Sequence, residues 1–279
     1  MTILPISLSE SSPAERRRLL ARARRLTQRA LSLAGAGKLA EAIVCQDEVT
    51  EIRPQDATAF FRLGMLCREA RRTEQAVQAL RRSAHLSPGD RDPREALTET
   101  LVEASRYDEA ILEARALLKI VPRSLFARDA LSVAYLQIGK IDKALQVTGE
   151  MVWLDPLNPG HHFRRGLLFQ QQGNLTAAVG EYTRALDMAH PESETYQDAE
   201  EALEMLDDEQ TRQILLLASE DWFFLLKLRR DLAEAVSERC FCLSEEGLAR
   251  LNHMLPHEFP DWIGDRPAPI SWGARGRYH

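Results

Sequence analysis

Residues 60–88 read FFRLGMLCREARRTEQAVQALRRSAHLSP, and this stretch decides the fold. It contains Gly64, Ala76 and Pro88, and residues of the same kind recur at intervals of 34 along the chain. The series are Ala42, Ala76, Ala110, Ala144 and Ala178; Pro54, Pro88, Pro122 and Pro156; and the small residues Ala30, Gly64, Thr98, Ser132 and Gly166. A fixed period of about 20–50 residues is typical of chains built from stacked repeats.

Each 34-residue unit contains two stretches with helical apolar periodicity, separated by a short polar break that holds Gly37, Gly139 or Gly173 in three of the units. Each unit is therefore predicted to be a pair of antiparallel helices. Small residues at two fixed positions allow the paired helices to pack closely. Proline ends the second helix, because it lacks the backbone donor and disfavours helix in the preceding residue. Aliphatic residues two positions before each proline position, able to pack into the next unit, are Ile52, Leu86, Ile120, Leu154 and Met188.

The stretch Phe60-x-x-Leu63-Gly64-x-x-Cys67, followed by Ala76 and Pro88, resembles the tetratricopeptide repeat family, and Leu97, Tyr107, Ala110 and Pro122 continue the resemblance. It covers about residues 23–192 and implies an all-α fold, a right-handed α-solenoid of five helical hairpins followed by C-terminal capping helices. The expected repeats are 23–56, 57–90, 91–124, 125–158 and 159–192. The departures are Arg29 and Arg165 at aliphatic positions, and Arg94 and His162 at positions for large apolar residues.

Residues 1–22 are expected to be an extension that runs into the first repeat helix, and residues 193–256 to be capping helices. Ser193 should begin an acidic helix, a second helical region should run from about Thr211 to Glu238, and Ser244 should cap a last helix. The stretch from Phe241 is weakly similar to helical leader regions of bacterial modified-peptide precursors. Residues 257–279 should form an irregular tail, either flexible or folded back on the helices through apolar residues such as Trp262.

The formal charge is -6, from 36 Lys and Arg against 42 Asp and Glu. Residues 192–209 hold nine acids and no Lys or Arg, so the acidity is local, while seven arginines cluster between Arg16 and Arg29. No aromatic residues interleave with that cluster, so we expect a solvated face and no nucleic-acid partner. No apolar run approaches the ~20 residues that a membrane span needs. Four cysteines are too few and too scattered for a disulfide framework, which favours a cytoplasmic location.

The expected function is a non-catalytic scaffold that holds a peptide or helix of a partner protein. No phosphate-binding loop, nucleophile elbow or zinc-protease motif is present in the sequence, and no cofactor is expected. Stacked hairpins present their first helices on a concave surface suited to such a ligand. The residues expected to line it are Phe61, Arg62, Met65, Arg68, Glu95, Glu99, Glu103, Phe126, Asp129, Val133, Gln137, Phe163, Arg164, Leu167 and Gln170.

This lining has an acidic centre, which favours an amphipathic partner segment that is basic in its middle. Exposed apolar side chains are informative because they reduce solubility unless a partner covers them. The alternative is that Phe126 and Phe163 pack between neighbouring repeats. The sequence leaves the oligomeric state open.

A second hypothesis is a zinc site in the C-terminal region. Cys240 and Cys242 precede His253 and His257, and two Cys followed by two His resembles zinc-ligand spacing. A single residue between the cysteines is tighter than the common zinc hairpin, so a pair of buried cysteines is the competing interpretation.

Overall fold

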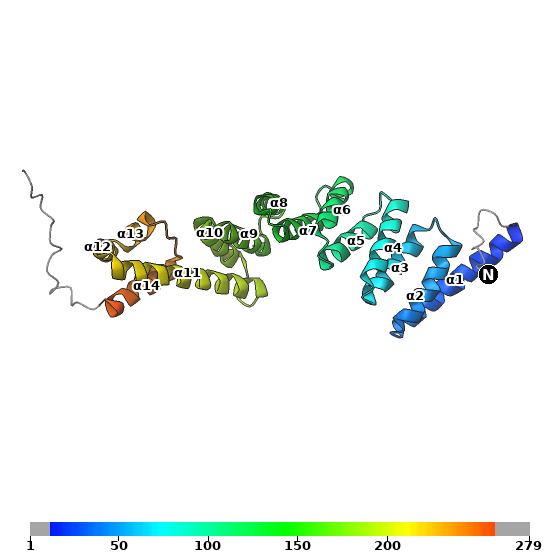
Figure 1. Cartoon of the computed structure of the whole chain (residues 1–279), viewed down its shortest axis with the longest axis horizontal. Coiled ribbons are helices and arrows are strands. Elements are labelled where there is room, and N and C mark those ends of the chain that lie inside the picture. Colours follow the sequence, from blue (N-terminus) through cyan, green and yellow to red (C-terminus); the bar gives the residue numbers. More distant parts are fainter. Residues whose placement is uncertain (1–11, 260–279) are drawn as a thin grey trace, which may run out of the picture. The chain divides into compact units, whose positions relative to one another are not determined.

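The computed structural model describes residues 12–259, which form fourteen α-helices and no strand within that range (Figure 1). The predicted all-α helical solenoid is thereby confirmed. The chain divides into two compact units, residues 1–156 and residues 157–279, called unit 1 and unit 2 below.

Unit 1 consists of four helical hairpins. Each first helix packs against its second helix, and each second helix packs against the first helix of the next hairpin. In addition, α5 contacts both α3 and α7, so these first helices lie side by side. The helices are α1 (Pro13–Gly35), α2 (Leu39–Ile52), α3 (Ala57–Glu69), α4 (Thr73–Leu86), α5 (Asp92–Glu103), α6 (Tyr107–Ile120), α7 (Leu125–Gln137) and α8 (Ile141–Leu154).

Close helix packing explains the small-residue series. A Cβ atom added to Gly64 would lie 2.6 Å from Cγ of Leu80, which is fully buried on the paired helix. The same contact recurs in the fifth hairpin, where a Cβ on Gly166 would lie 2.6 Å from the ring of Tyr182. The alanines of the 34-residue series have no exposed surface. These positions therefore accept only small side chains.

The ends of the helices follow the same period. The second helices α2, α4, α6 and α8 end at Ile52, Leu86, Ile120 and Leu154, each two residues before a proline of the series. The turns within the hairpins place one residue at positive φ, and the next amide donates to a carbonyl five residues back, as in a Schellman motif. The positive-φ residues are Gly37, Arg71, Ser105, Gly139 and Gly173.

Two of the departures from the repeat pattern are compensated by polar contacts with a glutamate. The Arg94 guanidinium donates to the Glu113 carboxylate at 2.8 Å, and His162 Nδ1 lies 2.9 Å from the Glu181 carboxylate. Both pairs join a first helix to its second helix across the same sequence separation of 19 residues. A polar side chain in the apolar position thus meets a matching acid on the paired helix.

Unit 2 begins with the fifth hairpin, α9 (Pro159–Gln172) and α10 (Leu175–Met188). It continues with α11 (Glu194–Glu220), α12 (Trp222–Arg230), α13 (Leu232–Glu238) and α14 (Glu245–Glu258). The expected break near Thr211 is wrong, because no Gly or Pro interrupts α11 and the chain turns only where Asp221 and Asp231 cap new helices. The predicted cap at Ser244 is confirmed, because Ser244 accepts from the Gly247 amide. Ser193, where the acidic helix was expected to begin, also caps its helix and accepts from the Tyr196 amide.

The segment before α14 is fixed to α11 by buried polar side chains. The Gln210 side-chain amide donates to the Cys242 carbonyl at 2.8 Å and accepts from the Cys242 amide at 2.7 Å. The buried Asp207 carboxylate accepts from the Ser244 amide at 2.9 Å. This segment is thus part of the core of unit 2, which gives its leader-like residues a structural role. Helix α14 extends to Glu258, so residues 257 and 258 of the expected tail are helical, and Trp262 lies outside the described residues.

Candidate functional site

The first helices α1, α3, α5 and α7 form one face of unit 1, which we call the first-helix face. Large apolar side chains are exposed on it at Leu31 (58% exposed), Met65 (37%) and Phe126 (37%). Leu31, Met65 and the half-buried Val133 occupy the same position of the 34-residue period. Arg62 and Gln137 are also exposed, while Glu95 and Asp129 are half-buried.

The predicted acidic centre of this face is neutralised from within the protein. The Arg68 guanidinium lies 2.5 Å from a Glu99 carboxylate oxygen and 2.8 Å from a Glu103 carboxylate oxygen. The hydrogen bond to Glu99, followed by that to Glu103, raises the pKa of Arg68 above its ordinary value. We expected a basic ligand because Glu99 and Glu103 were assumed to have no partner within the protein. Since both pair with Arg68, most of the reason for expecting a basic ligand is removed.

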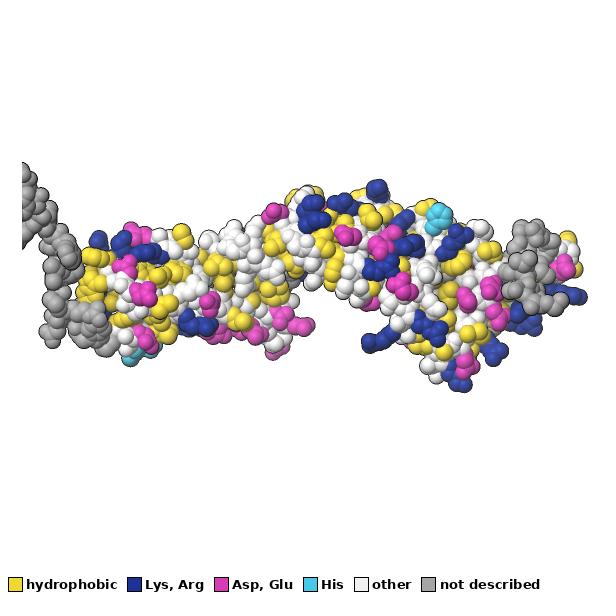
Figure 2. Space-filling view, viewed as in Figure 1, with side chains coloured by type: hydrophobic (Ala, Val, Ile, Leu, Met, Phe, Trp, Pro, Cys, Tyr) yellow, Lys and Arg dark blue, Asp and Glu magenta, His cyan; other side chains and the backbone are white. Residues whose placement is uncertain are grey.

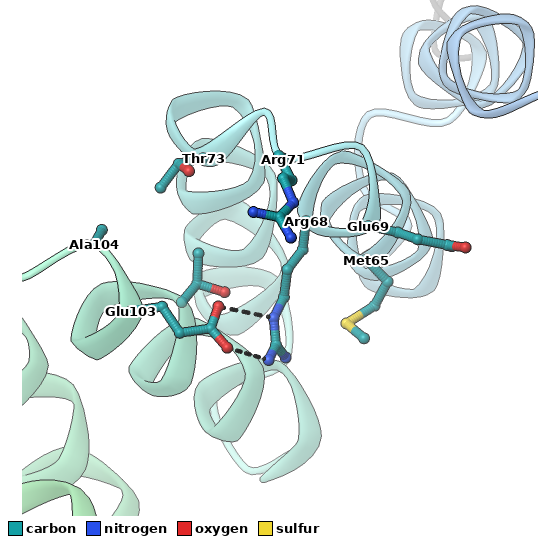
Figure 3. Close-up of a pocket in the computed structure, with 8 residues that line it drawn as sticks. Met65, Arg68, Glu69, Arg71, Thr73, Glu103 and Ala104 are labelled. Carbon is teal, nitrogen blue, oxygen red and sulfur yellow. Dashed lines mark hydrogen bonds and ion pairs between the residues drawn. The ribbon is translucent and has the colours of Figure 1, made fainter.

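A pocket of about 740 Å³ opens beside this ion-paired group (Figure 3). It lies between α3, the start of α4 and α5, and residues that line it are Met65, Arg68, Glu69, Arg71, Thr73, Thr100, Glu103 and Ala104. In Figure 3 Arg68 reaches across to Glu103, Arg71 lies beside Arg68, and the Glu69 side chain points away from both arginines. Two of the lining residues, Met65 and Ala104, are apolar, and the others are charged or carry a hydroxyl group, so the pocket offers both apolar and polar contacts.

Two of the aromatic residues expected on the surface are largely packed in the core. Phe61 is half-buried and packs against the cluster that contains Leu80 and Leu97. Phe163 in unit 2 packs against Tyr182, with ring centroids 5.9 Å apart. Phe163 is thus packed mainly against the second helix of its own hairpin, whereas Phe126 keeps more than a third of its surface exposed.

The remaining predicted residues lie on α9 of unit 2. Leu167 is 37% exposed, and the Tyr182 hydroxyl donates to the Gln170 side chain at 2.6 Å. Burial lowers the pKa of Arg164 and raises that of Tyr182 to about 12. The exposed apolar surface of α9 at these positions is therefore mostly that of Leu167.

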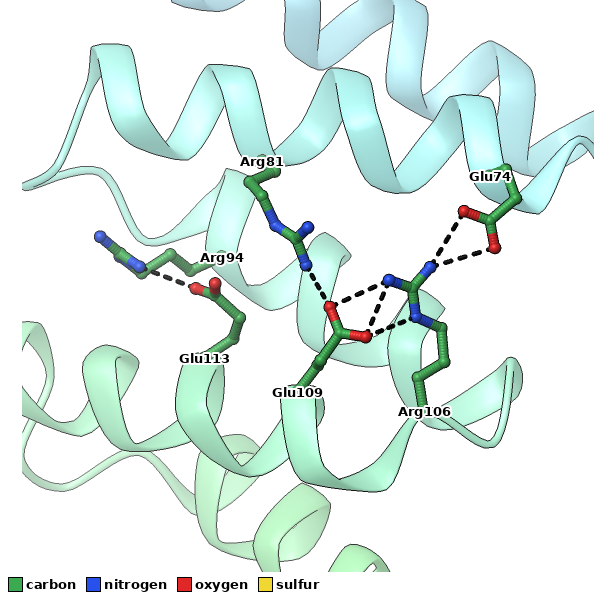
Figure 4. Close-up of polar contacts among 6 residues, drawn as sticks. All are labelled: Glu74, Arg81, Arg94, Arg106, Glu109 and Glu113. Carbon is green, nitrogen blue, oxygen red and sulfur yellow. Dashed lines mark hydrogen bonds and ion pairs between the residues drawn. The ribbon is translucent and has the colours of Figure 1, made fainter.

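Ion pairs away from the first-helix face connect the second and third hairpins (Figure 4). Arg81 on α4 donates to Glu109 on α6 at 2.6 Å, and Arg106 lies 2.8 Å from Glu109 and 3.1 Å from Glu74. The hydrogen bond from Arg81, followed by that from Arg106, lowers the pKa of Glu109. These charges hold neighbouring helices together.

The predicted basic and acidic regions are both on the surface. All seven arginines of α1 are exposed, and in Figure 2 dark blue side chains project along the α1 end of unit 1. Magenta acidic side chains gather over the start of α11. None of the described helices is both long enough and apolar enough to cross a membrane.

The expected zinc ligands do not assemble. Within residues 12–259 no group of three or more His, Cys, Asp or Glu side chains is placed to hold a metal ion. Cys240 is exposed in the turn after α13, while Cys242 is half-buried and held through its backbone by Gln210. His253 and His257 stack edge to face on α14, with ring centroids 5.3 Å apart. The arrangement of these four residues therefore gives the zinc hypothesis no support.

Comparison with known proteins identifies the type of repeat. A family model described as tetratricopeptide repeat matches residues 27–91 and 130–194. These two segments are tetratricopeptide repeats. This confirms the resemblance seen in the sequence, while the similarity to leader regions finds no support. No curated protein matches the sequence.

Solved tetratricopeptide structures share the fold. A MamA fragment from Desulfovibrio magneticus RS-1 is 17% identical, covering 60% of this chain and 94% of its own, with a TM-score of 0.54. YrrB, described as a TPR protein with an unusual peptide-binding site, is 18% identical, covering 63% of this chain and 90% of its own, with a TM-score of 0.54. At this level of identity the comparison concerns the fold.

Several pocket residues were absent from the sequence prediction, among them Arg71 in the turn of the second tetratricopeptide repeat and Thr73 at the start of α4. The 34-residue period could have pointed to Arg71. The turn within the hairpin is marked in three repeats by Gly37, Gly139 and Gly173, and the equivalent position in the second repeat is residue 71. A long basic side chain where other repeats have glycine marks this turn as unusual.

Proposed function

We propose that unit 1 holds a segment of a partner protein on its first-helix face. The observation that carries this proposal is the recurrence of exposed apolar side chains, Leu31 and Met65, at one position of the repeat, with a pocket of about 740 Å³ beside Met65. Exposed apolar side chains beside a concavity that supplies polar groups are typical of peptide-binding surfaces, because the apolar contacts give affinity and the polar groups fix the orientation of the ligand.

The energetics favour an apolar contact. Burying a Met or Leu side chain completely stabilises a complex by about 1.5–3 kcal/mol, so covering the remaining surface of Met65 and Leu31 contributes about 1 kcal/mol each. Phe126 on α7 adds a third partly exposed group. A ligand that covers all three extends across several repeats, as a segment in extended or helical conformation does.

The comparison with YrrB supports the same kind of ligand, since its description names a peptide-binding site. The charge of the ligand is a separate matter. Arg68 already pairs with Glu99 and Glu103, and Glu95 remains as the acid of this group without an ion pair among the described residues. The proposal therefore rests on apolar contacts, and the basic segment expected from the sequence is not retained as part of it.

Second helices provide the matched control. Leu112 on α6 is 65% exposed, more than Met65, but is not among the residues that line the pocket. If exposure alone determined binding, substituting Leu112 would weaken ligand binding at least as much as substituting Met65. If the first-helix face binds the ligand, substituting Met65 weakens binding and substituting Leu112 does not.

The test selects ligands from a displayed library of random 12-residue peptides on the purified chain and titrates the synthesised peptides by fluorescence anisotropy. We expect Met65→Ser to weaken binding about fivefold, the equivalent of about 1 kcal/mol, and Leu112→Ser to leave it unchanged. Circular dichroism confirms that both variants remain folded. The proposal fails if no peptide is enriched over bare support, or if Leu112→Ser weakens binding as much as Met65→Ser.

A further inference from the structure

The turn between α3 and α4 contains an unusual residue for its backbone conformation. Arg71 has a φ of 56°, in the left-handed region that side chains disfavour and glycine adopts readily. The equivalent residues of the first, fourth and fifth hairpins are Gly37, Gly139 and Gly173. Glycine thus satisfies this turn, and the arginine side chain is not needed for the fold.

The Arg71 guanidinium lines the pocket and has no ion pair or side-chain hydrogen bond among the described residues. Nearby carboxylates are already engaged, because Glu103 pairs with Arg68 and Glu74 with Arg106. Glu69 also lines the pocket, but in Figure 3 its side chain points away from Arg71, and no dashed line reaches Arg71 there. Arg71 therefore keeps its full set of donors available at the edge of the pocket.

We propose that the pocket between α3, α4 and α5 binds a carboxylate side chain of the partner segment, with Arg71 as the residue that recognises it. An arginine presents a planar fork of donors that matches a carboxylate with two parallel hydrogen bonds. Met65, which also lines the pocket, would contact an aliphatic side chain beside the acid. This inference rests on the proposed function and adds the chemistry of the ligand to it.

The surrounding charges favour a carboxylate over a phosphate. Arg71 contributes one available positive charge, while Glu69 and Glu103 line the same pocket and Glu99 belongs to the ion-paired group. A singly charged carboxylate balances Arg71, whereas a phosphate with nearly two negative charges meets stronger repulsion from these three glutamates.

A matched control exists in the next hairpin. Ser105 has the same backbone conformation, with a φ of 57°, in the equivalent turn between α5 and α6, and it is not among the residues lining the pocket. Arg71→Gly and Ser105→Gly each place the favoured residue in a left-handed turn. Neither variant is expected to lower the urea midpoint of unfolding, but Arg71→Gly alone removes the guanidinium.

The experiment uses the full chain and the 12-residue peptides selected above. We expect an Asp or Glu to be enriched at one position of the selected peptides. Replacing that residue by Asn or Gln should weaken binding of the peptide to the unsubstituted protein about tenfold. The Ser105→Gly variant should show the same tenfold preference, and Arg71→Gly should bind the acid and amide peptides equally. A further peptide, with phosphoserine in place of the Asp or Glu, should bind no more tightly than the peptide that carries the acid.

The outcomes separate the two proposals. Peptides that depend on Met65 but show no preference for the acid, or a preference that persists in Arg71→Gly, overturn the carboxylate site and leave the proposed function intact. Tighter binding of the phosphoserine peptide makes phosphate the ligand and also overturns it. Peptides that are indifferent to Met65 overturn the proposed function and, with it, the carboxylate site.

Discussion

The most direct structural prediction concerns Gly64, which the close packing of α3 and α4 keeps without a side chain. The Cβ of Gly64→Ala would meet Leu80 at 2.6 Å from Cγ, 2.7 Å from Cδ2 and 3.2 Å from the backbone nitrogen. Leu80 is fully buried, and its backbone belongs to the paired helix. The helices must therefore separate, or Leu80 must leave its packed position. Overpacking of this kind destabilises a protein by about 1–3 kcal/mol.

Gly149 in α8 is the matched control, because a Cβ there would meet nothing within 4 Å. Each substitution gains about 1 kcal/mol of helix propensity, since alanine replaces glycine inside a helix. This gain cancels in the comparison, so Gly64→Ala should be less stable than Gly149→Ala by about 1–3 kcal/mol, the steric contribution. Urea unfolding followed by far-ultraviolet circular dichroism measures the difference. Equal stability of the two variants would refute the close contact.

Three further predictions concern polar groups. Glu181→Ala should destabilise unit 2 by about 3–5 kcal/mol in urea unfolding, because it leaves His162 and neighbouring arginines without their buried acid. Two arginines lower the pKa of Glu109, so the ionised carboxylate stabilises the folded protein above the ordinary glutamate pKa of about 4.3, and this stabilisation is lost as the pH falls below that value. Glu109→Gln should therefore be less stable than the unsubstituted protein in urea unfolding at neutral pH, and the two proteins should become equally stable in acid. Ser244→Ala should cost about 1–2 kcal/mol in thermal unfolding, because it removes the α14 cap and a donor to Asp207.

Helix boundaries and packing positions were predictable because they depend on local chemistry repeated at a fixed interval. Within the 34-residue period, a proline two residues after an aliphatic residue marks the end of the second helix, as after Ile52 and Leu86. Small residues predict close helix contacts, as found at Gly64 and Gly166. Each of these features involves one residue type at one position, so a single sequence reveals it.

Charge pairing was not predictable in the same way. Arg68 and its partners lie 31 and 35 residues apart, and their pairing depends on how side chains reach between neighbouring first helices. The sequence showed an acidic centre and an arginine separately, which suggested a basic ligand. The α11 boundary was misplaced for a different reason: its acidic half and its apolar half differ in composition, yet no residue between them breaks a helix.

The position of the partner segment is tested most directly by site-specific photocrosslinking. A benzophenone amino acid is placed at residue 65 on α3 or at residue 112 on α6 of the full chain, and each protein is irradiated with a selected 12-residue peptide. Binding on the first-helix face predicts a crosslinked peptide from position 65 and none from position 112. Crosslinking from position 112 alone, or equally from both, would contradict it.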